Sequence, residues 1–144
     1  MKNRDDEGIL LVEDDPGHRE LILMALKDAH FTDRVYVAQD GQEALDFLFS
    51  RDSKPRFILL DLELPKISGL EVLRRIKVDA WSRSIPVIML TSSQNDRDIK
   101  LSFQWGANSY IVKPIQFDKF VDAIGKLGHY WLGLNEGEGE YTLS

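Results

Sequence analysis

Five short apolar segments constrain the fold of this chain more than any other feature. They are rich in branched and aromatic residues, as strands buried on both faces of a sheet tend to be. The segments are Ile9–Val12, Val35–Val37, Phe57–Leu60, Val87–Leu90 and Tyr110–Val112. Because they are short and separated by longer stretches, they predict five strands joined by helical crossovers.

Apolar residues at helical spacing fill the stretches that follow the predicted strands. Pro16 suits the first turn of a helix whose apolar residues include Leu21, Met24 and Ala25. Further helices are predicted around 44–49, over 70–77, around 96–104 and over 117–131. The helix over 96–104 has the weakest apolar stripe, so it is either the most mobile helix or the one that faces a partner. The alternation predicts an α/β, doubly wound (βα)5 fold of the flavodoxin-like class, with a five-stranded parallel sheet.

Chemically distinctive residues follow four of the predicted strands. Glu13 and Asp14 follow the first, Asp61 the third, Thr91 the fourth and Lys113 the fifth. Because the carboxyl ends of parallel strands share one edge of a sheet, where ligands usually bind, we expect these side chains to converge. Three carboxylates, a hydroxyl and an ammonium group suit a divalent cation with a phosphoryl group beside it.

Three carboxylates at one point require a compensating charge. Without a cation, at least one of them is expected to take up a proton. Mg²⁺ is the natural cation, because it prefers oxygen ligands and is commonly held by one or two carboxylates together with phosphate oxygens. Asp61 is then able to attack a phosphorus atom in line, while Lys113 and Thr91 stabilise the equatorial oxygens.

Composition and charge narrow the class of protein. A length of 144 residues with 43% hydrophobic residues fits one domain with a full core. The net charge of -6 argues against nucleic-acid binding through a broad basic surface. With no cysteine, neither a disulfide framework nor a cysteine-ligated metal is possible. No apolar run of about 18 residues occurs, so we expect a soluble cytoplasmic protein without a membrane contact.

Four motifs, taken in order, resemble those of response-regulator receiver domains in two-component signalling. They are Leu10–Pro16 (LLVEDDP), Leu60–Gly69 (LDLELPKISG), Val87–Ser92 (VIMLTS) and Gly106–Pro114 (GANSYIVKP). The resemblance covers about residues 8–131, which we interpret as the receiver domain, followed by a C-terminal extension over 132–144. It implies a signalling protein, not an enzyme, that accepts a phosphoryl group from a sensor histidine kinase and assists its own phosphotransfer and dephosphorylation.

The same resemblance implies how the metal and the phosphoryl group are held. Asp61 is the implied phosphoacceptor. Glu13 and Asp14 join it as acidic ligands of Mg²⁺, and the backbone carbonyl of Glu63 is a further ligand. Glu13 replaces the commoner Asp, which preserves metal binding with a longer reach. Glu63 stands where Asn is more usual, so its carboxylate adds negative charge near the phosphate, with an effect on phosphoryl lifetime or partner choice whose sign is open.

Two residues on later strands have implied roles in switching. Thr91 and Lys113 contact the phosphoryl group, and Thr91 moves after phosphorylation. Tyr110 occupies the switch aromatic position, whose inward rotation accompanies that movement. The bond between Lys113 and Pro114 is usually cis in this family. The histidines have no spacing that suggests a metal site, and His18 is expected to be exposed at the acidic edge or to touch a kinase partner.

A narrower likeness is to stand-alone receivers that partner bacterial and cyanobacterial phytochrome histidine kinases. It depends on Leu60–Lys66, on the lengthened region 50–56 and on the late Tyr130–Leu132. It implies phytochrome light signalling and a homodimer through the fourth helix, fifth strand and fifth helix. The C-terminal extension adds Leu132 and Leu134, which are unfavourable in water. The Gly-Glu alternation over 136–140 has the composition of a frayed tail.

Three hypotheses for function follow. The leading one is a single-domain phosphoacceptor. Only about 13 residues follow Trp131, too few for a helix-turn-helix, so output passes through changed protein contacts or onward phosphotransfer. A competing hypothesis is a dimeric adaptor that scaffolds a kinase without functional phosphorylation, although it would not need the acids, Thr91 and Lys113. A third, a small phosphohydrolase, is disfavoured because Glu63, and not an Asp, stands two residues after Asp61.

Overall fold

Strands and helices alternate along the whole described chain. A computed structural model describes residues 8–113 and 116–136, without the side chains of 127–129 and 131–136. The strands are β1 (Ile9–Val12), β2 (Val35–Ala38), β3 (Phe57–Asp61), β4 (Val87–Thr91) and β5 (Ser109–Val112). The helices are α1 (Pro16–Asp28), α2 (Gly41–Phe49), α3 (Gly69–Val78), α4 (Asp96–Gln104) and α5 (Phe117–Glu136).

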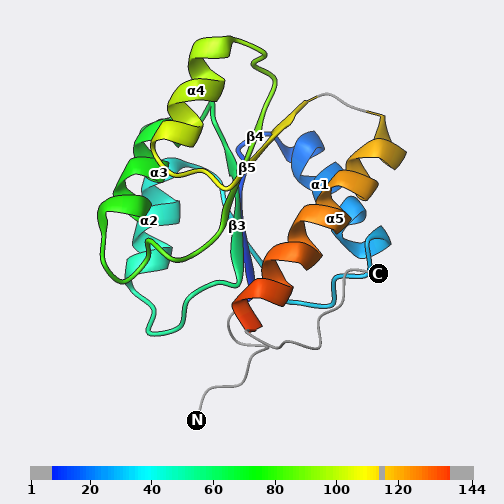
Figure 1. Cartoon of the computed structure of the whole chain (residues 1–144), viewed down its shortest axis with the longest axis horizontal. Helices are drawn as coiled ribbons and strands as arrows, with labels where there is room; N and C mark the ends of the chain where they lie inside the picture. The colour runs from blue at the N-terminus through cyan, green and yellow to red at the C-terminus, as the bar shows by residue number, and fades with distance from the viewer. Residues whose placement is uncertain (1–7, 114–115, 137–144) are drawn as a thin grey trace.

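All five strands lie in one parallel sheet with the order β2-β1-β3-β4-β5. Figure 1 shows the sheet almost edge-on, with α2, α3 and α4 against one face and α1 and α5 against the other. The predicted doubly wound, five-stranded flavodoxin-like fold is therefore confirmed. Its topology brings the carboxyl ends of β1, β3, β4 and β5 to one edge.

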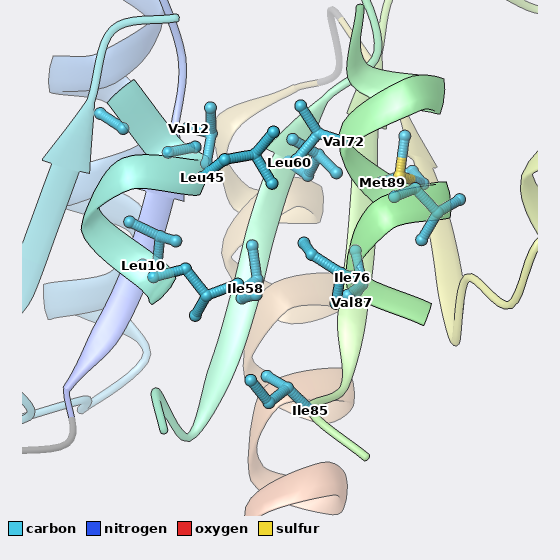
Figure 2. Close-up of a cluster of buried hydrophobic side chains, with 14 of the residues drawn as sticks. Leu10, Val12, Leu45, Ile58, Leu60, Val72, Ile76, Ile85, Val87 and Met89 are labelled. Atoms are coloured by element: carbon cyan, nitrogen blue, oxygen red, sulfur yellow. The ribbon is translucent and has the colours of Figure 1, made fainter. Parts of the chain in front are cut away.

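The central strands β1, β3 and β4 are buried along their whole length because each has a core on both sides, whereas β2 and β5 at the edges are partly exposed. Successive side chains point to opposite faces, so Leu10 and Val12 pack toward α2 and α3, while Ile9 and Leu11 pack toward α1 and α5. Figure 2 shows the first of these clusters, in which residues of β1, β3 and β4 meet Leu45 of α2 and residues of α3. Burial on both faces fixes the central strands and with them the loops at the edge.

Side-chain caps start the helices close to the strand ends. Asp15 accepts a hydrogen bond from the backbone N–H of His18 at 2.9 Å and begins α1. Asp40, Ser68 and Asn95 cap α2, α3 and α4 in the same way. Such caps satisfy backbone donors that the first helical turn leaves free. They fix the residue at which each helix begins.

The apolar face of α1 differs from the predicted one. Ile22, Ala25 and Leu26 are buried, whereas Leu21 and Met24 are 37% and 57% exposed. Leu21 and Met24, which helped to predict this helix, therefore lie outside the core, because the helix is turned so that Ile22, Ala25 and Leu26 face the sheet. In α4 only Ser102 is buried, which agrees with the weak apolar stripe of that helix.

The C-terminal helix extends beyond its predicted end. The sequence predicted helix as far as Trp131, but α5 continues to Glu136, so the Gly residues at 125, 128 and 133 do not stop it. Tyr130 is 39% exposed. The predicted tail beyond Glu136, the side chains of Leu132 and Leu134 and the bond to Pro114 lie outside the described residues.

Candidate functional site

The structure brings the predicted site residues together at the carboxyl edge of the sheet. Glu13 follows β1, Asp61 and Thr91 end β3 and β4, and Lys113 follows β5. Glu13 and Thr91 are fully buried, and Asp61 and Lys113 are 5% and 8% exposed. Asp14 is exposed. Four groups that normally seek water are therefore packed into one place at the end of the sheet.

Lys113 lies between two of the carboxylates. Its Nζ atom is 2.6 Å from Oε1 of Glu13 and 3.8 Å from Oδ2 of Asp61. The ion pair joins the residue after β1 to the residue after β5, two positions that are far apart in the sequence. One ammonium group compensates two buried carboxylates only in part, which leaves the cluster with excess negative charge.

Burial, together with the excess negative charge, raises the pKa of Asp61. Burial raises the pKa of its carboxyl to about 7, and the negative charge of Glu13 adds to the rise. Lys113 and the backbone N–H of Glu63, which donates to Asp61 Oδ1 at 3.1 Å, act in the opposite direction. A cation at this point would favour the ionised form of Asp61.

The acidic cluster has the donor atoms that a hard divalent cation requires. Glu13, Asp14 and Asp61 each offer a carboxylate oxygen, and these three atoms lie within 4.8 Å of one another. Mg²⁺ is bound by such oxygens together with water and substrate phosphate. The exposure of Asp14 leaves one side of the cluster open. The residues present therefore fit a magnesium ion with a phosphoryl group beside it.

Comparison with known proteins gives the family. A model of the response regulator receiver domain matches residues 9–125. The chain belongs to the receiver-domain family of response regulators. It is a signalling family, and the sequence-based resemblance is thereby confirmed.

Individual relatives of this receiver come from two kinds of pathway. The chain is 42% identical over 135 residues to a probable methanogenesis regulatory protein, FilR2 of Methanothrix harundinacea, covering 91% of this chain and 87% of FilR2. Among solved structures, the bacteriophytochrome response regulator AtBRR is 46% identical with a TM-score of 0.71, covering 83% of this chain and 91% of AtBRR. The phosphorylated cyanobacterial phytochrome response regulator RcpA is 36% identical with a TM-score of 0.78, covering 88% and 94%. The predicted likeness to phytochrome response regulators is confirmed.

The carboxylate of Glu63, in the loop after β3, contacts two hydroxyl groups at the end of β4. Its Oε1 atom accepts a hydrogen bond from Ser92 Oγ at 2.9 Å, and the Thr91 hydroxyl lies 3.4 Å from the same oxygen. The backbone N–H of Ser93 donates to Thr91 Oγ1 at 3.0 Å. Sequence reasoning treated the Glu63 carboxylate only as added charge, and the successive hydroxyls of Thr91 and Ser92 at the end of β4 were the signal for this contact.

Tyr110 connects β5 to the loop that precedes α4. Its hydroxyl donates to the backbone carbonyl of Ser93 at 3.0 Å, and its ring centre lies 6.4 Å from that of Phe103 on α4. Burial raises the pKa of the Tyr110 phenol. Tyr110 thus contacts both the loop that follows Thr91 and a side chain of α4.

Two residues of α1 support the receiver's acidic edge and were not predicted to do so. His18 is exposed, as predicted, but its Nδ1 atom also lies 3.2 Å from Lys113 Nζ. Arg19 Nη1 donates to the backbone carbonyls of Glu13 and Asp14 at 3.2 and 3.1 Å. Both contacts depend on how α1 approaches the edge, which spacing in the sequence does not specify.

Gly69 lets α3 begin in close contact with the end of β3, which carries Asp61. A Cβ atom at position 69 would overlap the carbonyl oxygen of Asp61 and lie 2.6 Å from the Cα atom of Leu62. The backbone N–H of Gly69 donates to the carbonyl of Leu62 at 2.8 Å. No larger side chain fits without moving the strand end, so the glycine fixes the backbone that presents Asp61.

The helices in the described ranges are too short or too polar for a membrane span.

Proposed function

We propose that Asp61 of this receiver accepts a phosphoryl group from the phosphohistidine of a sensor histidine kinase. The observation that carries the proposal is the position of Asp61, buried beside Glu13 and Lys113 and within a carboxylate cluster that is open on the side of Asp14. A nucleophilic oxygen, a cation site and an ammonium group are the parts that phosphoryl transfer needs.

The transfer forms one bond and breaks another. A carboxylate oxygen of Asp61 bonds to phosphorus while the phosphorus–nitrogen bond of the donor breaks, and the donor imidazole keeps the electron pair and takes up a proton. Asp61 has to be ionised to attack, and its pKa of about 7 keeps it partly protonated at neutral pH without a cation. The residues that would hold Mg²⁺ are Glu13, Asp14 and Asp61, with the backbone carbonyl of Glu63. Bound there, the ion would lower the pKa of Asp61 and draw charge from the phosphoryl oxygens.

Lys113 and Thr91 complete the proposed chemistry. In the loose transition state, charge spreads over the equatorial oxygens, and Lys113 Nζ is already 3.8 Å from Asp61 Oδ2. Thr91 is buried at the neighbouring strand end with its hydroxyl near Glu63. The same two groups would stabilise attack of water on the acyl phosphate, so the protein assists its own dephosphorylation.

We propose that output passes through the α4-β5-α5 face. Capture of the Thr91 hydroxyl by the phosphoryl group would break its contact with Glu63 and shift the loop that Tyr110 holds through Ser93. That loop leads into α4, where Phe103 is 49% exposed.

The receiver domain spans 8–131 in this proposal. The extension over 132–144 contributes to a homodimer formed through the α4-β5-α5 face. Light scattering with and without beryllofluoride, which mimics the phosphoryl group, tests whether the dimer forms.

We propose a phytochrome histidine kinase in the cytoplasm as the partner. The support is the 46% and 36% identity to the phytochrome response regulators AtBRR and RcpA, over more than four fifths of each chain. The 42% identity to FilR2 favours a second candidate, the same phosphotransfer chemistry in a pathway that light does not govern. Phosphotransfer from a phytochrome kinase that differs between red and far-red light would decide for the first.

Intact-mass measurement tests the central step. The protein is incubated with acetyl phosphate and Mg²⁺ beside an Asp61→Asn control and a sample with chelator. We expect a gain of one phosphoryl mass that requires Mg²⁺ and is absent from the control. No gain under conditions that preserve acyl phosphates would favour the alternative, a dimeric adaptor that does not depend on phosphorylation.

A further inference from the structure

Lys113 has a third neighbour besides Glu13 and Asp61. The Nδ1 atom of His18 lies 3.2 Å from its Nζ atom, and the imidazole is 48% exposed on the first turn of α1. An ammonium group only donates hydrogen bonds, so Nδ1 is the acceptor and the ring proton lies on Nε2. His18 therefore offers Lys113 a partner that carries no negative charge.

The position of the imidazole is set by the start of α1. The backbone N–H of His18 donates to Asp15 Oδ1 at 2.9 Å, which closes the first turn of the helix. The neighbouring Arg19 ties the same turn to the carbonyls of Glu13 and Asp14. His18 is thus fixed to the loop that carries two of the acidic residues, and its ring contacts the ammonium group of Lys113, the residue after β5.

The partners of Lys113 differ in their relation to a metal ion. Glu13 belongs to the group of three carboxylates that suits a divalent cation. A cation there would repel the ammonium group and compete for the carboxylate that Lys113 binds at 2.6 Å. His18 does not belong to that group, and its Nδ1 atom is 3.8 Å from Glu13 Oε2. If a bound metal drew Glu13 away from Lys113, His18 would remain as an acceptor for the ammonium group.

We propose that His18 is a positioning residue for Lys113. Its Nδ1 atom holds the ammonium group at the solvent side of the cluster when the metal occupies Glu13, so that the positive charge stays available to the incoming phosphoryl group. This inference rests on the proposed function, since it concerns the transfer to Asp61. His18 itself neither binds the phosphoryl group nor moves a proton.

Two substitutions separate the acceptor from the volume of the ring. His18→Leu keeps an exposed side chain of similar bulk without an acceptor, whereas His18→Gln restores an acceptor oxygen. With acetyl phosphate and saturating Mg²⁺, we expect the leucine variant to be phosphorylated about fivefold more slowly and the glutamine variant to be close to wild type. Calorimetry should give Mg²⁺ dissociation constants within about twofold of each other for all three proteins.

A second measurement needs neither metal nor phosphoryl donor. Nitrogen-15 NMR of the metal-free protein at alkaline pH should show the His18 ring with its proton on Nε2, and Lys113→Met should shift the Nδ1 resonance. An unchanged resonance, equal rates in the leucine variant and wild type, or equally slow leucine and glutamine variants would overturn the role of His18. A wild-type protein that gains no phosphoryl mass would instead overturn the proposed function, and this role with it.

Discussion

The two ends of the sheet each hold a lysine whose ammonium group is withdrawn from bulk water. At the carboxyl end, Lys113 faces the carboxylates of Glu13 and Asp61. At the amino end, the acceptors of Lys77 of α3 within the described residues are neutral oxygens: the carbonyls of Ile85 and Arg83 at 2.7 and 3.1 Å and the side chain of Asn108 at 3.2 Å. Lys113 is therefore surrounded by charged carboxylates, whereas Lys77 is surrounded by neutral carbonyl and amide oxygens.

The difference shows which end is built for a ligand. Burial lowers the pKa of Lys77 to about 8, but its three acceptors occupy its three protons and join α3 to the segments before β4 and β5. At the other end, the pKa of Asp61 is raised to about 7 because one ammonium group does not balance the buried carboxylates. The three acceptors balance the ammonium group at the amino end, whereas the carboxyl end keeps an excess of negative charge that an added cation would compensate.

Removal of the lysine at the carboxyl end should have the largest effect on stability. Lys113→Met leaves the fully buried Glu13 without its ion-pair partner, which costs about 3 kcal/mol. Urea unfolding in chelator measures the loss, and Mg²⁺ should restore part of it. Lys126→Met is the control, because its pair with Asp122 is exposed on both sides and should contribute below about 1 kcal/mol. Equal effects of the two substitutions would contradict the difference in burial.

Removal of the lysine at the amino end should affect stability alone. Lys77→Met removes the donor to the carbonyls of Arg83 and Ile85 and one of two donors to the side chain of Asn108, which should cost about 2 kcal/mol. The rate of phosphorylation with acetyl phosphate and its Mg²⁺ dependence should be the same as in wild type. A change in that Mg²⁺ dependence would show that the two ends are not independent.

Asp61→Asn should stabilise the metal-free protein at the expense of function. The pKa of Asp61 is higher in the folded state than its ordinary value of 3.8, so its contribution to stability is present at low pH and is lost as pH rises through about 7. The variant should therefore gain about 2 kcal/mol above neutral pH and almost nothing near pH ~4. Urea unfolding at both pH values in chelator checks this, with the exposed Asp14→Asn expected to gain less.

Loss of a single neutral hydrogen bond beyond the cluster should have the smallest effect. Tyr110→Phe removes the donor to the Ser93 carbonyl, which contributes about 1 kcal/mol. Phosphorylation with acetyl phosphate should keep its rate, while amide exchange in the loop before α4 becomes faster. Unchanged exchange there would contradict the assignment of Tyr110 as the tie between β5 and that loop.

Parallel topology explains why much of the carboxyl end could be predicted. Once the five apolar segments are strands of one sheet, the residues after them must share an edge, and the structure places Glu13, Asp61, Thr91 and Lys113 there. The starts of the helices were also predictable in part, because Pro16 and the glycine after Ser68 mark first turns. The site follows from the rule that the carboxyl ends of parallel strands share one edge, and the helix starts follow from the local preferences of proline and glycine.

Contacts that depend on the rotation or tilt of helices were not predictable. Lys77 belongs to the last turn of a helix, where a lysine is ordinarily solvated, and only the packing of α3 brings it to Asn108. The same reason hid the contact of His18 with Lys113 and the exposure of Met24. Spacing identifies a helix and its period, but the exact face that meets the sheet is set by tertiary packing.

Mapping of the modified residue tests the central claim most directly. The protein is treated with acetyl phosphate and Mg²⁺, reduced with borohydride to convert an aspartyl phosphate to homoserine, and digested for peptide sequencing by mass spectrometry. We expect homoserine at position 61 alone, and none in a sample treated with chelator. Homoserine at Asp14, or an aspartyl phosphate that persists in Asp61→Asn, would contradict the assignment of the buried carboxylate beside Lys113 as the phosphoacceptor.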